Sequence, residues 1–334
     1  MGQSRVADLQ QGVDVHEEFQ VRDAGPLRST WLSYDEDMNV SARDHILRLL
    51  ARQEWLRGRD RIIRAFSHPD RQESRLFEAD FFGQTYSGNM NNFIDWSVFY
   101  YGAFAGHELQ LLSALAAALR AKGKPVNFYD VGANIGHHTL FMSRRADRVF
   151  SFEPFSLVRN EMERKLNHAG VENVTIFPAA LGDENETGVF HPPTGANQGT
   201  GTLGHLLPDN ASSETISVPV TRGDDFLSGN QLPPISLLKM DVEGYETKVL
   251  SGLRETILRD RPPILLEIQP EEESAVEAAK GARIEDLLYP DHLLFGVTQS
   301  RGRFVLKPFS LGGTEEALVL PAELAGILPG TVLH

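Results

Sequence analysis

The sequence contains no cysteine, which excludes disulfides, thiolate metal sites and cysteine nucleophiles. The covalent route that methylates carbon atoms of pyrimidines needs such a nucleophile and is excluded with them. No apolar run reaches the roughly 18 residues that indicate a membrane-spanning helix. The first 20 residues are polar and acidic, whereas a signal peptide is basic and then apolar. We therefore expect a soluble, cytoplasmic chain without a signal peptide.

Basic residues are too few to balance the acidic ones. The chain has 32 Lys and Arg against 46 Asp and Glu, a formal net charge of −14, and nearly all of the excess lies in residues 76–334. An acidic surface repels a phosphate backbone, so no nucleic-acid partner is expected. The length of 334 residues, 41% of them hydrophobic, suits one large domain with an appendage.

The Gly-rich turn at residues 130–136 is the strongest sign of a ligand site. It follows an apolar-leaning strand and holds Gly132 and Gly136 where a backbone must bend sharply and approach a ligand closely. A second strand over 148–152 leads into Glu153, 17 residues after Gly136, where a carboxylate can bind a ribose. The third glycine of a dinucleotide fingerprint is absent, which favours S-adenosylmethionine because that ligand carries no pyrophosphate.

Strands and helices alternate after this turn, which predicts an α/β fold with a parallel sheet. A helix over 156–169 precedes a third strand over 174–181 that ends near Asp183. This carboxylate could accept a hydrogen bond from an adenine amine, or it could be an ordinary turn residue. Two more apolar strands, over 235–240 and 264–268, bring charged residues to the same edge of the sheet. We expect a polar cluster there of Lys239, Asp241, Glu243 and Glu267.

Residues 77–107 combine many aromatic rings with amides. Rings cover the apolar faces of sugars while amides bind their hydroxyls, but packing against the next domain explains the rings equally well. An amphipathic helix upstream has Ser41 as its expected N-cap. The arginines after it could bind a phosphate, although such charges more often form a solvated face. They are Arg57, Arg59, Arg61 and Arg64.

Five short motifs together resemble those of the FkbM-type methyltransferases. They are Asp-Val-Gly-Ala-Asn-Ile-Gly at 130–136, Phe-Glu-Pro at 152–154, Ala-Leu-Gly-Asp at 180–183, Lys-Met-Asp-Val-Glu-Gly-Tyr-Glu at 239–246 and Leu-Glu-Ile at 266–268. They occur in the order and spacing of that family, over roughly residues 85–300. The resemblance implies S-adenosylmethionine as the cofactor and a class I methyltransferase fold, a Rossmann-like seven-stranded sheet with helices on both faces. It also implies methyl transfer to a hydroxyl of a sugar, glycan or natural product.

The chain is expected to have four parts. A mainly helical and partly flexible extension covers 1–75, and the aromatic lead-in with its helix, a candidate substrate-side element, covers 76–126. The S-adenosylmethionine domain is expected over 127–315 and a C-terminal tail over 316–334.

The expected chemistry is an in-line attack of a substrate oxygen on a sulfonium methyl group, in which positioning does much of the work. Asp241 is the first candidate for the general base, with Lys239 orienting it or stabilising charge. His138 is the second candidate, and Glu243 and His137 are further ones. The residues expected to bind the cofactor are Asp130, Gly132, Asn134, Gly136, Glu153 and Asp183.

Metal use and catalysis itself are left open by the sequence. Asp241, Glu243 and Glu267 offer oxygen ligands that could hold Mg²⁺ against two substrate hydroxyls. One alternative function is a module of the same fold that binds S-adenosylmethionine without turnover. Another is an N-methyltransferase, although the Asn/Asp-Pro-Pro-aromatic motif of exocyclic amine methylation is absent after the fourth strand.

Overall fold

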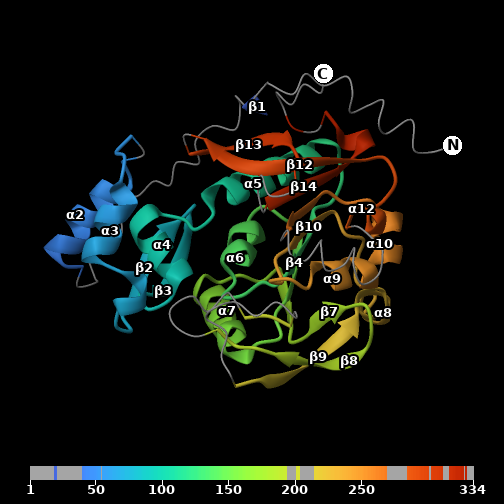
Figure 1. Cartoon of the computed structure of the whole chain (residues 1–334), viewed down its shortest axis with the longest axis horizontal. Helices are drawn as coiled ribbons and strands as arrows, with labels where there is room; N and C mark the ends of the chain where they lie inside the picture. The colour runs from blue at the N-terminus through green and yellow to red at the C-terminus, as the bar shows by residue number, and fades with distance from the viewer. Residues whose placement is uncertain are drawn as a thin grey trace.

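A nine-stranded sheet forms the centre of the molecule (Figure 1). The computed structural model describes residues 19–20, 40–53, 55–193, 201–203, 214–268, 284–300, 302–310, 316–326 and 328. The strand order in the sheet is β1-β13-β12-β14-β11-β10-β4-β5-β6. The bounds are β1 Phe19–Gln20, β4 Asn127–Val131, β5 Arg148–Phe152, β6 Val174–Phe177, β10 Leu237–Met240, β11 Ile264–Glu267, β12 His292–Ser300, β13 Arg303–Pro308 and β14 Glu316–Pro321.

Seven of these strands form the sheet expected from the sequence. β6, β5, β4, β10 and β11 are parallel neighbours, β14 runs antiparallel to β11, and β12 runs antiparallel to β14. From β4 the chain first builds outward through β5 and β6, then crosses to the other side at β10. The gap between β4 and β10 is therefore the switch point where such sheets bind ligands. The expected class I methyltransferase fold is confirmed, with β13 and β1 as additional strands at one edge.

Helices cover both faces because the central strands are apolar on both sides. In β4 every residue is buried, and Phe128 packs into one core while Tyr129 packs into the other, as the two-residue period of a strand requires. The first core is covered by α5 Gly106–Ala121, α6 His137–Ser143 and α7 Ser156–His168. The second is covered by α8 Gly223–Gly229, α9 Glu246–Gly252, α10 Arg254–Asp260 and α12 Ile284–Leu287.

The N-terminal helices and the aromatic lead-in lie beside the first core (Figure 1). They comprise α2 Ala42–Ala51, α3 Arg59–Phe66, the 3₁₀ turn η1 Pro69–Arg71, the hairpin of β2 Leu76–Phe81 and β3 Gln84–Asn89, and α4 Phe93–Tyr101. Ser41 caps α2 as expected, since its hydroxyl accepts from the Asp44 amide at 3.1 Å. Leu47, Ile63 and Trp96 belong to the first core, so these elements pack continuously onto the sheet.

The expected single strand over 174–181 is wrong. Residues 174–181 form two strands, because Pro178 has no N–H for a ladder hydrogen bond, and the chain leaves the main sheet after β6. The second of them, β7 Ala180–Gly182, joins a small sheet with β9 Ile216–Arg222 and β8 Glu186–Phe190.

The expected tail at 316–334 also starts with a central strand. β14 lies between β11 and β12, and its residues from Ala317 to Leu320 are all buried, as an apolar strand covered on both faces must be. The C-terminal boundary of the sheet therefore lies beyond residue 315. Within the described ranges no helix combines the length and the apolar character needed to cross a membrane.

Candidate functional site

A first cavity lies at the carboxyl edge of the sheet, on the switch point between β4 and β10. Gly132, Glu153 and Asp241 follow β4, β5 and β10 and all line it. Its volume is about 60 Å³, below the roughly 300 Å³ of small ligand pockets, so its walls must open for a nucleoside-sized ligand. Other wall residues are Val131, Asn134, Phe152, Pro154, Phe155, Val158, Ala179, Ala180, Leu181, Phe190, Gly201, Leu203, Val242, Glu243 and Tyr245.

The turn after β4 admits only glycine at two of its positions. Gly132 has a φ of +81°, and a Cβ there would lie 1.8 Å from the backbone oxygen of Asp241. Gly136 has a φ of +77° at the start of α6, and its Cβ would lie 2.5 Å from Met162 Cγ. The glycines therefore let the β4 and β10 ends touch and let α6 pack closely on α7. Both were predicted from the sequence as positions of close approach.

Glu153 braces this turn from the neighbouring strand. Its carboxylate accepts from the amides of Asn134 at 2.9 Å and Phe155 at 2.8 Å. Burial raises the pKa of Glu153 to about 7, although the two N–H groups oppose this shift. Each carboxylate oxygen has two lone pairs, so Glu153 can accept further hydrogen bonds from a ligand in the cavity that it lines.

Lys239 and Asp241 do come together at the end of β10. Lys239 Nζ lies 3.1 Å from Asp241 Oδ2 and 3.9 Å from Asp130 Oδ1. Burial alone would lower the pKa of Lys239, but the carboxylates of Asp241 and Asp130 raise it above its ordinary value, so the ammonium stays charged. Asp130 is fully buried, accepts from Thr139 Oγ1 at 2.6 Å, and is not part of the cavity lining.

Two other expected site residues lie elsewhere. His138 is buried on α6, with Nε2 3.3 Å from Glu108 Oε2, and is not part of the first cavity's lining. Asp183 follows β7 of the small sheet instead of the end of the third strand of the main sheet. Its carboxylate lies 3.6 Å from Lys248 Nζ, also outside that lining.

The expected Mg²⁺ ligands do not form a set in the described part of the chain. Asp241 pairs with Lys239, and Glu267 at the end of β11 is in register with Glu316 of β14. The group of His and acidic side chains that does converge among the described residues is a different one: His107, Glu108 and Glu316. An Mg²⁺ site at Asp241, Glu243 and Glu267 is therefore not supported.

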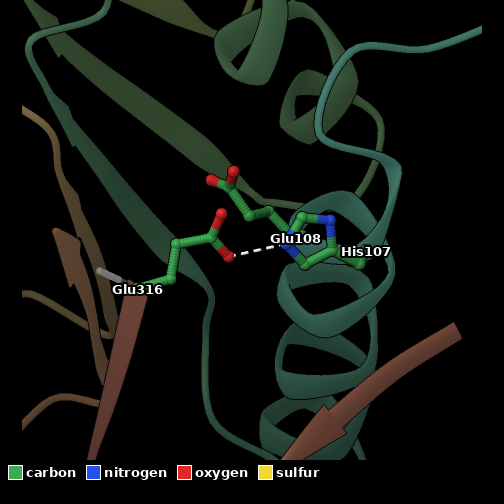
Figure 2. Close-up of side chains that lie close together, drawn as sticks. All are labelled: His107, Glu108 and Glu316. Carbon is green, nitrogen blue, oxygen red and sulfur yellow. Dashed lines mark hydrogen bonds and ion pairs between the residues drawn. The ribbon is translucent and has the colours of Figure 1, made fainter. Parts of the chain in front are cut away.

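A second, larger cavity of about 620 Å³ contains this His107–Glu108–Glu316 cluster in its wall. His107 Nε2 lies 2.6 Å from Glu316 Oε2 (Figure 2). Burial lowers the pKa of His107, but the Glu316 and Glu108 carboxylates raise it more. The sequence prediction missed this cluster, because it gave His107 and Glu108 no functional role and placed Glu316 in a tail.

Some side chains of the aromatic stretch and of the N-terminal arginines line the second cavity. Its wall includes Phe82, Phe93, Trp96, Tyr101 and Phe104 together with Arg52, Arg59 and Arg64. Other rings of the stretch, including Phe77, Phe81 and Tyr86, are buried in the first core. Some rings therefore only pack in the core, whereas others, such as Trp96, pack there and also line the cavity.

Residues of the two cavities pack against one small apolar cluster. Phe104 of the second cavity packs in one small cluster with Phe155 and Val158 of the first. Lys239 is close enough to Glu108 for its charge to lower the pKa of Glu108.

Comparison with known proteins gives one matching family, described as "Methyltransferase FkbM domain", over residues 130–293. The chain is 30% identical over 127 residues to the hexuronic acid methyltransferase AglP of Haloferax volcanii, covering 37% of this chain and 48% of AglP. It is 30% identical over 159 residues to the 2-O-methyltransferase NoeI of Sinorhizobium fredii, covering 43% of this chain and 63% of NoeI. The chain therefore spans less than two thirds of either relative.

Among solved structures, the comparison matches Methyltransferase FkbM from Methylobacillus flagellatus. The TM-score is 0.35 at 17% identity, covering 55% of this chain and 43% of that one. The bifunctional kinase-methyltransferase WbdD has a TM-score of 0.40 at 11% identity, covering 68% of this chain and 42% of its own.

Proposed function

Since this chain belongs to the FkbM methyltransferase family through residues 130–293, we propose that it is an S-adenosylmethionine-dependent O-methyltransferase. The acceptor in this proposal is a hydroxyl of a sugar or a related natural product. The observation that carries it is the first cavity, where a glycine turn, a ribose-type carboxylate and an ion-paired aspartate meet at the switch point of the sheet.

The residues around the first cavity suit this cofactor. Gly132 and Asn134 present turn backbone for close approach, and Gly136 holds α6 behind them. Glu153 would accept hydrogen bonds from the ribose hydroxyls. Bound there, S-adenosylmethionine supplies an electrophilic methyl group on a sulfonium. Asp130 supports the turn from behind, and Asp183 stays a weaker candidate because it lies outside the lining.

Asp241 is the proposed general base. Its side chain is 40% exposed and lines the cavity, so an acceptor hydroxyl can reach it, while Lys239 is buried beneath it. The ion pair holds the carboxylate in one orientation, and the hydroxyl proton passes to it as the oxygen attacks. His138 is disfavoured as the base because it contacts Glu108 and does not line this cavity.

The second cavity is the proposed site for the body of the acceptor, whose reacting hydroxyl would have to reach Asp241 in the first cavity. Its volume of about 620 Å³ falls within the range of small-molecule pockets. Its rings can cover apolar sugar faces, while its arginines suit an acceptor with a carboxylate or phosphate. The names of AglP and NoeI, a hexuronic acid methyltransferase and a 2-O-methyltransferase, support a sugar hydroxyl. The net charge of −14 argues against a nucleic-acid acceptor.

Methyl transfer to a sugar panel tests this function. The purified chain is incubated with S-adenosylmethionine and with neutral sugars, uronic acids or sugar phosphates, and S-adenosylhomocysteine is measured. We expect product with anionic sugars, its loss in Asp241→Asn, and its retention in Asp225→Asn, a control on α8 that pairs with Arg222. Cofactor binding without turnover on any hydroxyl acceptor would support the non-catalytic module instead, and methylation of an amine would support the N-methyltransferase.

A further inference from the structure

We propose that His107, Glu108 and Glu316 form a binding site for a divalent transition-metal ion in the wall of the second cavity. Their ligand atoms all lie within 4.8 Å of one another, and each residue is half-buried. Figure 2 shows the three side chains converging from two elements, the start of α5 and the start of β14. The site is separate from the Asp241, Glu243 and Glu267 set considered from the sequence.

The fold places this cluster at the ligand-binding edge of the sheet. β14 is antiparallel to β11, so its first residue, Glu316, pairs with Glu267 at the carboxyl end of β11. That edge is where Asp241 and Glu153 also lie, next to the first cavity. The cluster therefore faces an open cavity on the functional edge, a position in which a bound ion can have free coordination sites.

His138 provides a second, independent indication of a ligand. Its side chain is nine-tenths buried, and among the described residues its Nε2 has Glu108 as an ion-pair partner but makes no well-aligned hydrogen bond. That nitrogen lies 3.3 Å from Glu108 Oε2 and so points toward the cluster from α6. A buried imidazole nitrogen beside Glu108 can turn toward an ion that Glu108 binds, and so offers a fourth ligand.

The ligand types of the cluster, imidazole nitrogens and carboxylate oxygens, determine which metal ion it prefers. Such mixed nitrogen and oxygen sets bind Zn²⁺, Mn²⁺ or Fe²⁺, whereas Mg²⁺ prefers oxygen ligands alone. Bonds of roughly 2.1 Å keep neighbouring ligand atoms about 3 to 4 Å apart. The side chains therefore need only small rotations, in which the ion replaces the hydrogen bond between His107 and Glu316.

The charges of the cluster also favour a divalent cation. Glu108 and Glu316 are two carboxylates held close together, with His138 and His107 as their partners, and a divalent ion bound by all of these side chains would balance both negative charges at once. Lys239, the nearby ammonium, already pairs with Asp241 and Asp130. The role of the ion rests on the proposed function: its free positions would hold hydroxyl oxygens of the acceptor in the second cavity.

Metal binding to the full chain tests the site without any acceptor. The chain is stripped with a chelator and titrated with Mn²⁺, followed by electron paramagnetic resonance, and Zn²⁺ and Mg²⁺ are then added as competitors. We expect one Mn²⁺ site that Zn²⁺ displaces and equal Mg²⁺ does not. Glu316→Gln and His107→Asn should each weaken Mn²⁺ binding by about tenfold or more. Even the loss of a residue that only orients a metal ligand weakens metal binding by that much. Glu323→Gln, an exposed partner of Arg261, is the control and should bind normally.

Three outcomes would overturn the site: no Mn²⁺ or Zn²⁺ binding by the folded chain, displacement by Mg²⁺ as readily as by Zn²⁺, or unchanged affinity in Glu316→Gln. Should the variants fail to fold, Co²⁺ is bound to the unsubstituted chain and its absorption spectrum is recorded. A spectrum that shows nitrogen ligands supports the site, and one that shows oxygen ligands alone overturns it. A separate titration with S-adenosylmethionine distinguishes the two proposals. Cofactor binding without metal binding removes only the metal site, and metal binding without cofactor binding removes only the proposed function.

Discussion

Lys239 holds Asp241 at the rim of the first cavity through a 3.1 Å ion pair between Nζ and Oδ2. The lysine is the buried member, at the end of β10, and the aspartate is the exposed one. A charge fixed beneath a reactive carboxylate sets its orientation before substrate arrives, so the pair prepares the proposed base.

Replacing Asp241 by Asn should therefore affect turnover and not cofactor affinity. The amide keeps the shape and still approaches Lys239, but it cannot accept the hydroxyl proton. We expect kcat to fall by about 10²–10⁴ and the Kd for S-adenosylmethionine to change less than about threefold. Initial rates of S-adenosylhomocysteine formation and calorimetry measure the two quantities. Full activity in this variant would show that Asp241 is not the base.

Cofactor binding should depend on pH through Glu153, whose pKa is about 7. A sulfonium ligand whose ribose donates to the carboxylate favours the ionised form, so affinity should fall as pH falls through 7. Below that pH, binding should release a proton, detectable by calorimetry in two buffers of different ionisation enthalpy. In Glu153→Gln the proton release should vanish. Release that persists in this variant would assign the titration to another group.

The same raised pKa predicts how the stability of the unliganded chain changes with pH. Between pH 4.5 and about 7 the folded chain holds a proton on Glu153 that the unfolded chain has lost. The contribution of this group to the free energy of unfolding should therefore decrease as pH rises through that window. Urea unfolding of the unsubstituted chain and of Glu153→Gln, compared at both ends of the window, measures it. A contribution that grows with pH would contradict the shift.

Gly132 should tolerate no side chain, unlike a glycine of similar backbone conformation elsewhere. A Cβ at Gly132 meets the Asp241 backbone oxygen at 1.8 Å, whereas Gly123, with a φ of +71°, has nothing within 4 Å. Gly123→Ala should lose only about 1 kcal/mol to backbone strain. Gly132→Ala should lose several times more free energy of unfolding and should also lose cofactor binding. Thermal unfolding measures the first effect and titration with S-adenosylmethionine measures the second. Equal losses in both variants would show that the close approach of the two strand ends is not needed.

A buried ion pair should contribute strongly to holding the lead-in against α7, in addition to the apolar packing of the first core. Lys165 Nζ on α7 lies 2.9 Å from Asp95 Oδ1 on α4, and both side chains are almost fully buried. Lys165→Met leaves Asp95 charged and unpaired, so the free energy of unfolding should fall by about 3–5 kcal/mol. Arg120→Met, which breaks an exposed pair with Asp147, should cost at most about 1 kcal/mol. Urea unfolding curves that coincide for these variants would contradict the role of Asp95 and Lys165.

The parts of the site that sequence could predict are those encoded locally. Gly132, Glu153 and Asp241 each end a strand, and parallel strands bring such ends to one edge. The predicted strand over 174–181 runs past the true end of β6 at Phe177. Pro178 marks that end, but the apolar residues continue beyond the proline to Leu181. Which rings of the aromatic stretch pack and which line a cavity depends on how α4 sits against the sheet, and no local pattern records this.

The His107–Glu108–Glu316 cluster lay beyond sequence reasoning for a topological reason. His107 and Glu316 are 209 residues apart and meet only because β14 enters the sheet in reverse between β11 and β12. The sequence analysis assigned Ala317 to Leu320 to a tail, and the place and direction of this buried strand in the sheet follow from long-range packing.

The central claim is that the first cavity binds S-adenosylmethionine through Glu153, and calorimetric titration tests it most directly. The unsubstituted chain and Glu161→Ala, a control on α7 that pairs with Arg164, should bind the cofactor at one site and should not bind NAD. Glu153→Ala should bind it about 10- to 100-fold more weakly, the worth of hydrogen bonds to a charged group. Folded chain that binds no S-adenosylmethionine, or equal affinity in Glu153→Ala, would contradict the account.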